Sequence, residues 1–392
     1  MTVPTLDRVI GSSRSHLVRC YLLDPAGALV AQLPVERGEL TGTATPGDRW
    51  VGSVQLAGEE WLPTGPTHPL SGFTGHRVRV QLGSTVDTRP VFVTVADLIV
   101  GGSRVSRSRE DYGHELALYG LAGYVSQAAE RSYRPGAGET CQGMIRRVVD
   151  ANRPPGWPPT TVLDSSAPIP VPSDYAVDGR PAWDVVEDLS TLANVSVFVD
   201  PVQRLVIRPA LPNTPRTPAR TLTTAHDVTG WRLGVGRGSG FGNRVELRCS
   251  PVQVSSEVDQ LRDDVVGVAE QTTGPLGSGT VGRVVVQAQQ LTGAISKAAA
   301  DARAAALLGP ALRSWLTVEL DVVPDPRLTI DDDVVVDYGG GSVMHHRITG
   351  LALPLTTEQM RVELRTFDDQ LPGPLGRHRI VERSPHPPPP RT

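Results

Sequence analysis

A glycine-rich segment is the first pattern in this sequence whose residue types and spacing could serve chemistry. Residues 234–242 read Gly-Val-Gly-Arg-Gly-Ser-Gly-Phe-Gly. Phosphate-binding loops use such glycines where backbone N–H groups approach an anion at the start of a helix. The next residues, Asn243-Arg244-Val245-Glu246-Leu247-Arg248, alternate as in a strand, and no Gly-Lys-Ser/Thr is present. We therefore predict a loop between two strands.

A run of three carboxylates, Asp331-Asp332-Asp333, together with Asp337, could form a site for a hard cation such as calcium. The glycine and the distal glutamate of an EF-hand loop are missing from the required places, so a polar turn entering the strand Val334 to Val336 is the favoured interpretation. Whether a metal binds at Asp331–Asp333 stays open. His345-His346 resembles a metal-ligand pair, but neighbours on a strand point to opposite faces. We expect solvent-facing or interface histidines.

Nucleophilic and acid–base catalysis need further patterns that the sequence does not supply. GxSxG, SxxK and a Cys–His signature are absent in convincing context. Glu59-Glu60 and Glu110-Asp111 are carboxylate pairs, but adjacent residues seldom face one substrate bond, so solvated loop charges are expected. Cys20, Cys141 and Cys249 have no CxxC spacing and are expected to be reduced, structural thiols. We predict no catalytic, cofactor-binding or metal-binding residues, and no enzyme.

Composition limits the class of protein. Of 392 residues, 40 are Gly and 35 are Pro, which favours short strands joined by turns, while 39% hydrophobic residues suffice for a core. The net charge of −4 argues against a nucleic-acid binder. Lys297 is the sole lysine among 38 basic residues, a bias typical of a GC-rich genome. Neither an apolar run of transmembrane length nor a signal peptide is visible, so we predict a soluble, strand-rich protein.

The elements of the first 124 residues predict a β-barrel or sandwich domain. Strands are expected at Leu17 to Leu23 and, after the turn Asp24-Pro25-Ala26-Gly27, at Leu29 to Val35. Further strands are expected at Trp50 to Leu56, His76 to Leu82, Val91 to Val100 and Glu115 to Tyr124. Val78, Val80 and Leu82 alternate with polar residues, the pattern of a strand with one solvated face.

Residues 125–215 predict a small α+β insert that ends in a Pro-rich linker. Thr140 is a candidate N-cap for a helix through Val149, and a second helix is expected from Pro181 to Ala193 with Trp183, Val186, Leu189 and Leu192 on its apolar face. The runs Val195 to Val199 and Arg204 to Arg208, joined by Asp200-Pro201, predict a hairpin.

A second β-domain is expected at 216–371. Strands are predicted at Asp227 to Val235, Asn243 to Cys249, Trp315 to Leu320, Asp333 to Tyr338, His346 to Leu353 and Met360 to Thr366. The polar stretch Ser250 to Thr280 is expected to hold loops and an excursion from the main sheet. An Ala-rich helix is expected over Leu291 to Leu308. Residues 372–392, which lie outside the residues that the structure describes, are expected to form a flexible Pro-rich tail. The predicted fold class is mainly β, with two tube-like β-domains flanking a helix-plus-hairpin insert.

This order of elements resembles the hub proteins at the tip of bacteriophage tails, including the N-terminal region of tail-associated hubs, in short forms from phages or prophages of high-GC actinobacteria. The resemblance rests on the strands Val91 to Val100 and Glu115 to Tyr124, then Tyr133 to Thr140 before the first helix. It continues through Pro181 to Leu189, the hairpin ending Val206-Ile207-Arg208-Pro209, Gly242-Asn243-Arg244-Val245, the Ala-rich helix, and Ile348 to Leu355. These patterns match in residue type and not in exact sequence, and they cover most of residues 15 to 370.

The resemblance implies a homotrimer in which two similar β-domains per chain give pseudo-sixfold symmetry. Such a ring would join the sixfold tail tube to a threefold tip and would bear on host attachment and genome ejection. Its expected partners are the distal tail protein or tail tube, the tape-measure C-terminus, and tip, spike or fibre proteins. The expected location is the virion tail tip, after assembly in the host cytoplasm. Long hubs carry a C-terminal lysin or fibre-like region, and that activity is not carried over to this chain.

Two other classes of function stay open. A receptor-binding or carbohydrate-binding tail-tip protein would need exposed aromatics gathered on one surface, and Trp50, Trp61 and Trp157 lie in or near loop-like segments. A cell-wall hydrolase would need a compact acid–base or metal constellation, which the sequence does not indicate.

Overall fold

The computed structural model describes residues 17–44, 49–86, 89–107, 112–128, 131–172, 175–212, 214–235, 241–250, 265–292, 297–325, 327–356 and 358–367. In these ranges strands predominate over helices, which confirms the mainly β fold class. No helix within them combines the length and the apolar character needed to cross a membrane.

The first β module contains the predicted strands and one that was not predicted, β3, to which Val35 belongs instead of the predicted strand Leu29 to Val35. Its strands are β1 (Leu17–Leu23), β2 (Leu29–Leu33), β3 (Val35–Thr43), β4 (Trp50–Leu56), β5 (Arg77–Val86), β6 (Arg89–Arg107) and β7 (Tyr112–Tyr119), with a short 3₁₀ helix η1 (Glu59–Trp61) between β4 and β5. The β1–β2 hairpin closes through the Asp24 side chain, which accepts from Ala28 N at 2.7 Å. Val78, Val80 and Leu82 are buried, as their alternation predicts.

The second β module continues the same sheet. It contains β13 (Arg220–Thr223), β14 (Val228–Val235), β18 (Leu316–Val322), β19 (Asp333–Asp337), β20 (Val343–Pro354) and β21 (Met360–Thr366). β20 pairs antiparallel with β3, so that Gly350–Pro354 lies against Glu39–Thr43. Within the described residues this makes one 13-stranded sheet with a shared apolar core. The strands predicted near β18 to β21 are confirmed, whereas the four-residue β13 was not predicted.

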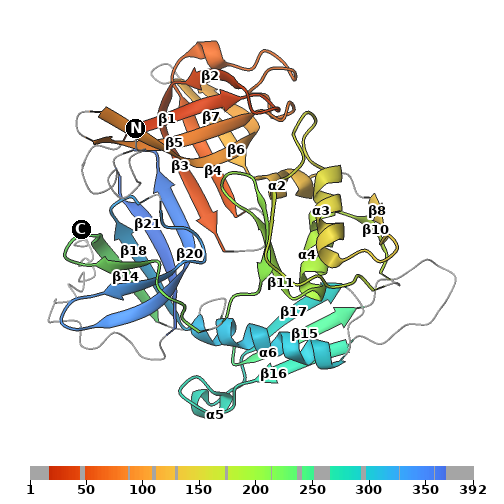
Figure 1. Ribbon diagram of the computed structural model, residues 1–392. Helices are drawn as coiled ribbons and strands as arrows, with labels where there is room; N and C mark the ends of the chain where they lie inside the picture. Colours follow the sequence, from red (N-terminus) through yellow and green to blue (C-terminus); the bar gives the residue numbers. More distant parts are fainter. Residues whose placement is uncertain are drawn as a thin grey trace, which may run out of the picture.

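The insert packs beside the first module around its own core (Figure 1). It contains α2 (Leu121–Ser126), β8 (Arg131–Tyr133), α3 (Cys141–Ala151), β9 (Val162–Asp164), β10 (Val177–Arg180), α4 (Ala182–Leu192), β11 (Val195–Val199) and β12 (Leu205–Pro209). The Thr140 hydroxyl accepts from Gly143 N at 3.1 Å, which confirms the predicted N-cap of α3. The prediction of a strand through Tyr124 is wrong beyond Tyr119, because Leu121 begins α2 and buries its side chain in the insert core.

A three-stranded sheet lies apart from the 13-stranded sheet and carries a long helix (Figure 1). The strands of this sheet are β15 (Arg244–Ser250), β16 (Val265–Glu270) and β17 (Val286–Thr292). The same part of the chain contains the short helix α5 (Ser278–Val281) and the long helix α6 (Lys297–Arg313). The expected excursion from the main sheet is confirmed at β16. The Ala-rich helix is predicted too early, because Leu291 and Thr292 belong to β17, where they pair with Cys249 and Ser250 of β15. The helix also runs through Pro310 to Arg313.

The three cysteines are buried thiols, as the sequence predicts. Burial raises the pKa of Cys20 to about 12 and that of Cys141 to about 11. Neither thiol is therefore ionised near neutral pH, and ionisation is what a nucleophile or a metal ligand requires.

Candidate interdomain junction

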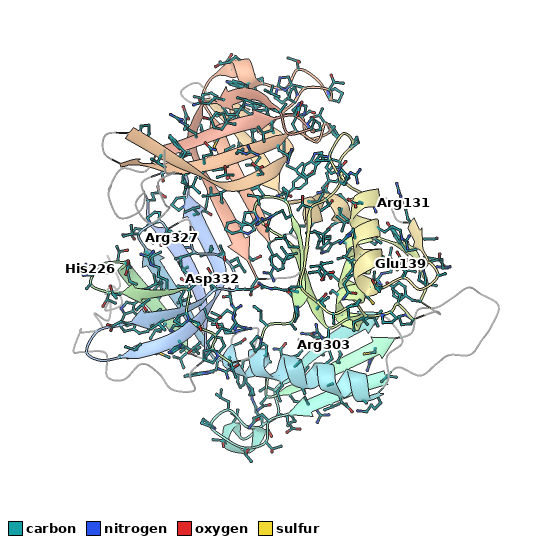
Figure 2. All side chains as sticks on the ribbon, viewed as in Figure 1. Arg131, Glu139, His226, Arg303, Arg327 and Asp332 are labelled. Atoms are coloured by element: carbon teal, nitrogen blue, oxygen red, sulfur yellow. The ribbon has the colours of Figure 1, made fainter. Side chains whose placement is uncertain are left out.

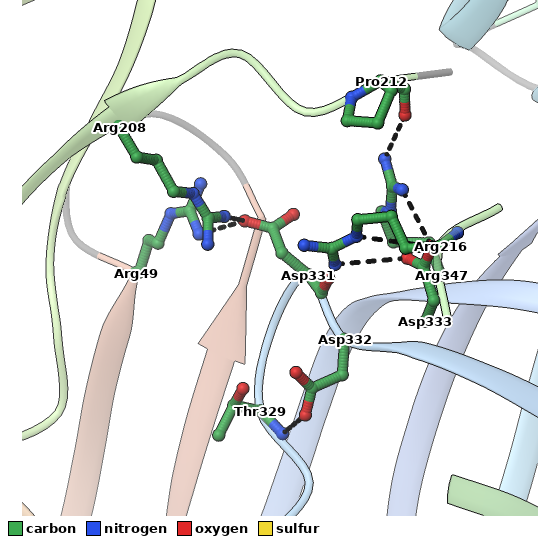
Figure 3. Close-up of polar contacts among 9 residues, drawn as sticks. All are labelled: Arg49, Arg208, Pro212, Arg216, Thr329, Asp331, Asp332, Asp333 and Arg347. Carbon is green, nitrogen blue, oxygen red and sulfur yellow. Dashed lines mark hydrogen bonds and ion pairs between the residues drawn. The ribbon is translucent and has the colours of Figure 1, made fainter. Parts of the chain in front are cut away.

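The turn at Asp331–Asp333 binds four arginines. Asp331 Oδ2 accepts from Arg49 Nη1 and, at 2.6 Å, from Arg208 Nη2. Asp333 accepts from Arg347 through both carboxylate oxygens, at 2.6 and 3.0 Å (Figure 3). These carboxylates therefore bind guanidinium groups. The turn leads directly into β19, which confirms the predicted polar turn.

The arginines around this turn come from distant parts of the chain. Arg49 directly precedes β4 of the first module, Arg208 lies in β12 of the insert, and Arg347 lies in β20 of the second module. Arg216 lies in the Pro-rich segment between the insert and β13. A single turn thus binds the two β modules, the insert and the linker to one another.

An aromatic ring from the insert lies against two of these guanidinium groups. The guanidinium carbons of Arg49 and Arg208 lie 3.8 and 4.8 Å from the centre of the Phe198 ring in β11. Two like charges so close are tolerated because they share the Asp331 carboxylate and the face of an aromatic ring. Burial lowers the pKa of Arg208, and the neighbouring Arg49 lowers it further, whereas Asp331 opposes the shift.

Asp333 fixes the linker to the second module. Its Oδ2 accepts from the backbone N of Arg216 at 2.6 Å, and Arg347 Nη1 donates to the carbonyl oxygen of Pro212 at 2.9 Å. Burial raises the pKa of Asp333, but the hydrogen bonds from Arg347 and Arg216 outweigh that effect and the net pKa is lowered. The ionised carboxylate is thus the form that this junction stabilises.

The same contacts decide what chemistry the acidic run supports. Asp332 accepts from Thr329 N at 3.0 Å, and Asp337 accepts from Gly339 N at 2.8 Å. Across the ranges that the structure describes, no group of three or more His, Cys, Asp or Glu side chains is placed to hold a metal ion. The carboxylates of Asp331 and Asp333 serve as acceptors for arginine, so the arrangement supports an ion-paired joint.

A left-handed backbone occurs at three joints between units, where Asp331, Gln203 and Asn194 have φ values of 72°, 66° and 51°. Asp and Asn tolerate this conformation, whereas for Gln203 it is costly and persists because the surroundings enforce it. The Asn194 side chain accepts from Arg303 Nη1 of α6 at 2.8 Å, which ties the insert to the helix of the small sheet (Figure 2).

The turn of the β11–β12 hairpin forms another joint. Gln203 Oε1 accepts from Leu121 N at 2.6 Å, where β7 passes into α2. Pro201 O accepts from Asp97 N of β6 at 2.7 Å. Asp97 in turn forms a bidentate pair with Arg79 of β5, with both distances 2.7 Å. The hairpin is therefore fixed both to the start of the insert and to the first β module.

The other residues that the sequence singles out lie elsewhere. His345 and His346 point to opposite faces as predicted, but the expectation that both face solvent or an interface is wrong for His346. Its ring is fully buried, and Nε2 lies 3.0 Å from Tyr338 Oη. Burial lowers the pKa of His346 to about 3, so this imidazole is neutral.

Two further patterns are partly outside the described residues. Of the glycine-rich segment, 236–240 are not described, but its flanks belong to the strands β14 and β15, as predicted. Glu110-Asp111 also lies outside, whereas Glu59 and Glu60 are exposed on η1. Trp50 and Trp157 are buried at 8% exposure and Trp61 is partly buried, so these three rings do not form an exposed aromatic surface.

Comparison with known proteins identifies the fold. No protein-family model matches the chain, and no curated protein matches it in sequence. A tail protein from Neisseria meningitidis MC58 matches with a TM-score of 0.57 at 15% identity, covering 90% of this chain and 97% of that one. The 43 kDa tail protein of prophage MuSo2 from Shewanella oneidensis matches with a TM-score of 0.58 at 11% identity, covering 89% and 98%. The chain thus has the fold of these tail proteins over nearly its whole length.

Proposed function

We propose that the chain is a structural protein of a phage tail, namely the hub at the distal end that joins the tail tube to the tip. The observation that carries the proposal is the match to two tail proteins, one of them from a prophage, over about nine-tenths of this chain. The buried ion pairs at Asp331 and Asp333 support it, because they hold two β modules and an insert in one fixed arrangement. A component that bears load between other proteins needs such fixed joints.

The finer parts of this proposal concern symmetry and partners. A homotrimer with two β-domains per chain would present six similar units to a sixfold tail tube. The division into 1–124, 125–215, 216–371 and the tail 372–392 belongs to the same proposal. The proposed neighbours are the distal tail protein or tube, the tape-measure C-terminus and a tip or fibre protein, in the virion after assembly in the host cytoplasm. A role in host attachment and genome ejection follows from that position.

The mass of the purified chain in solution tests the threefold hub. Light scattering behind a sizing column should give about 126 kDa, three times the chain mass of 41.9 kDa. Electron microscopy of that species should then show a ring with a central channel. A stable dimer at high concentration would contradict the threefold arrangement. A monomer at all concentrations, both alone and mixed with tube protein, would contradict it as well.

The two alternative functions have separate tests. A hydrolase would clear a suspension of cell walls, and an adhesin would bind host cells in the absence of other tail proteins. Activity in either assay, retained by the purified chain, would replace the structural proposal.

A further inference from the structure

The core of the second β module contains a titratable side chain, His346. Its ring is fully buried, and its Nε2 lies 3.0 Å from the hydroxyl of Tyr338. Nδ1 is buried as well, and no described residue forms a hydrogen bond with it. The Tyr338 ring packs edge-on against the rings of His346 and Trp231, with centres 6.0 and 5.8 Å apart. These surroundings fit a neutral imidazole and offer no second hydrogen-bond acceptor to an imidazolium.

The strands on either side of His346 present no charge to its ring. The imidazole lies opposite Val334 of β19 and Thr366 of β21. Successive residues of a strand point to opposite faces. The other face of the sheet therefore takes the charged residues next in these three strands, which are Asp333, Arg347 and Arg365.

Two titratable groups remain near His346 among the described residues. The Tyr338 phenol faces the imidazole, and His345 acts on it from the opposite face. Burial, with a smaller contribution from His345, lowers the pKa of His346 to about 3. No carboxylate of the described residues opposes this shift, so the folded core selects the neutral form.

Strand register links His346 to the interdomain junction. His346 directly precedes Arg347 in β20, and its partner Val334 directly follows Asp333 in β19. Asp333 is the carboxylate that Arg347 binds at 2.6 Å (Figure 3). The core contact and the junction contact therefore depend on the same short stretch of pairing between β19 and β20. Separation of the two strands at His346 also separates Asp333 from Arg347.

β19 is attached to the large sheet by few residue pairs. It lies off the main order of strands, pairs over five residues with β20, and is flanked on its other side by the four-residue β13. The connection from β19 to β20 contains Gly339, Gly340 and Gly341, which have left-handed φ values of 83°, 63° and 84°. A short contiguous element with few contacts is the kind of unit that opens locally while the rest of a protein stays folded.

We propose that protonation of His346 opens the interdomain junction, because β19 separates from β20 and Asp333 leaves both Arg347 and the linker. A charged imidazole is costly in an apolar core and is stabilised by water, so acid favours the opened form in which His346 is hydrated. In that form the pKa of His346 returns to about 6.5. Below pH 6.5 the opened form therefore binds more protons, and the closed form loses stability as the pH falls toward 3. This opening is a property of the single chain and does not depend on the proposed function.

Hydrogen exchange of the purified chain at different pH values tests the proposal. After correction for the intrinsic exchange rate, the opening constant of amides 333–337 and 343–347 should rise about ninetyfold from pH 7.5 to pH 4.5. The amide of Arg216, which donates to Asp333 Oδ2, should follow it. In His346→Gln, which stays neutral and can still bond with the Tyr338 hydroxyl, the rise should be less than threefold. The matched control is His345→Gln, which removes an imidazole from the opposite face and should respond like wild type.

The amides of β5 in the first module distinguish local opening from unfolding of the whole chain. They should keep their protection between pH 7.5 and pH 4.5. An equal loss of protection in β5 and β19 would overturn the proposal, as would a constant opening of β19 in wild type. An undiminished rise in His346→Gln would show that another group is responsible.

NMR titration of the histidine side chains in wild type gives a check that does not require the variant to fold. The His346 ring should stay neutral down to pH 4.5, because its protonation is coupled to opening of the core. A titration midpoint near pH 6.5 would mean that the folded core accepts the charge, and the proposal would fail.

Discussion

Asp333 and Arg347 face each other directly across β19 and β20, and their side chains form a bidentate ion pair that is almost inaccessible to solvent. The two side chains are 3% and 2% exposed. Removing two such charges from water is costly, and the cost is offset only when their remaining hydrogen-bonding groups are also filled. The backbone N of Arg216 and the carbonyl oxygen of Pro212 fill them here.

Loss of one member of this pair should therefore be far more damaging than loss of both. We expect Arg347→Met to lower the free energy of unfolding by about 3–5 kcal/mol, because it leaves a buried carboxylate without its main partner. The double variant Arg347→Met, Asp333→Leu should recover at least half of that loss. Urea unfolding followed by tryptophan fluorescence measures both. Equal destabilisation by the single and double variants would show that the uncompensated charge is not the cause.

Asp331 offers a test of the joint between modules. Asn tolerates the left-handed backbone at this position, so Asp331→Asn removes the charge that Arg49 and Arg208 share while keeping the turn. We expect trypsin to cleave after Arg216 at least tenfold faster in this variant, because the insert and linker separate more readily from the second module. The matched control is Asp332→Asn, whose side-chain oxygen can still accept from Thr329 N. Similar cleavage rates for both variants would contradict the role of Asp331.

Local patterns in the sequence identify most single elements. The alternation at Val78, Val80 and Leu82 predicts β5, and Thr140 predicts the start of α3. Both signals act within a few residues, since strand alternation and N-capping depend on neighbours in the chain. β17 escapes such reasoning because Gln and Ala favour helices and because its pairing with β15 supplies the strand geometry.

The junction could not be predicted because its partners are far apart in the sequence. Arg49 and Asp331 are separated by 282 positions. The sequence does not indicate which of its many arginines pairs with a given carboxylate. The acidic run at 331–333 was visible, but its charge alone does not say whether a cation or guanidinium groups neutralise it. The near absence of lysine is interpreted above as codon bias, and it does not identify the arginines that form buried bidentate pairs, although arginine suits such pairs. The pairing of β20 with β3 could not be predicted either, because the two strands are far apart in the sequence.

Gln203 should stabilise the folded chain through the hydrogen bond that it accepts from Leu121 N. Gln203→Ala leaves a left-handed residue in the hairpin turn and removes the acceptor of a buried backbone N–H. A buried donor without a partner costs about 1–3 kcal/mol, and we expect a loss of stability in that range in thermal or urea unfolding. Gln203→Gly should be less damaging by about 1 kcal/mol, because glycine relieves the backbone strain. If the glycine variant is the less stable one, the strain at this position is not significant.

Because of Asp188, the insert should be more stable in mild acid than near neutral pH. Burial raises the pKa of this carboxyl to about 6, while Arg180 partly opposes the shift and Asp184 and Glu187 add to it. A folded-state pKa above the unfolded value of about 4 means that the folded chain binds more protons between pH 4 and 6, so stability falls as the pH rises through that window.

The difference between wild type and Asp188→Asn isolates this effect from other titrating groups such as Asp333, whose lowered pKa acts only at more acidic pH. Two pKa units correspond to about 3 kcal/mol. Between pH 4 and pH 6.5 the free energy of unfolding, measured with urea, should therefore fall by up to that amount more in wild type than in the variant. The asparagine stays neutral at both pH values but retains an oxygen that can accept from Arg180. Equal pH dependence in the two proteins would mean that Asp188 is ionised in the folded chain throughout this range, with Arg180 outweighing the effect of burial.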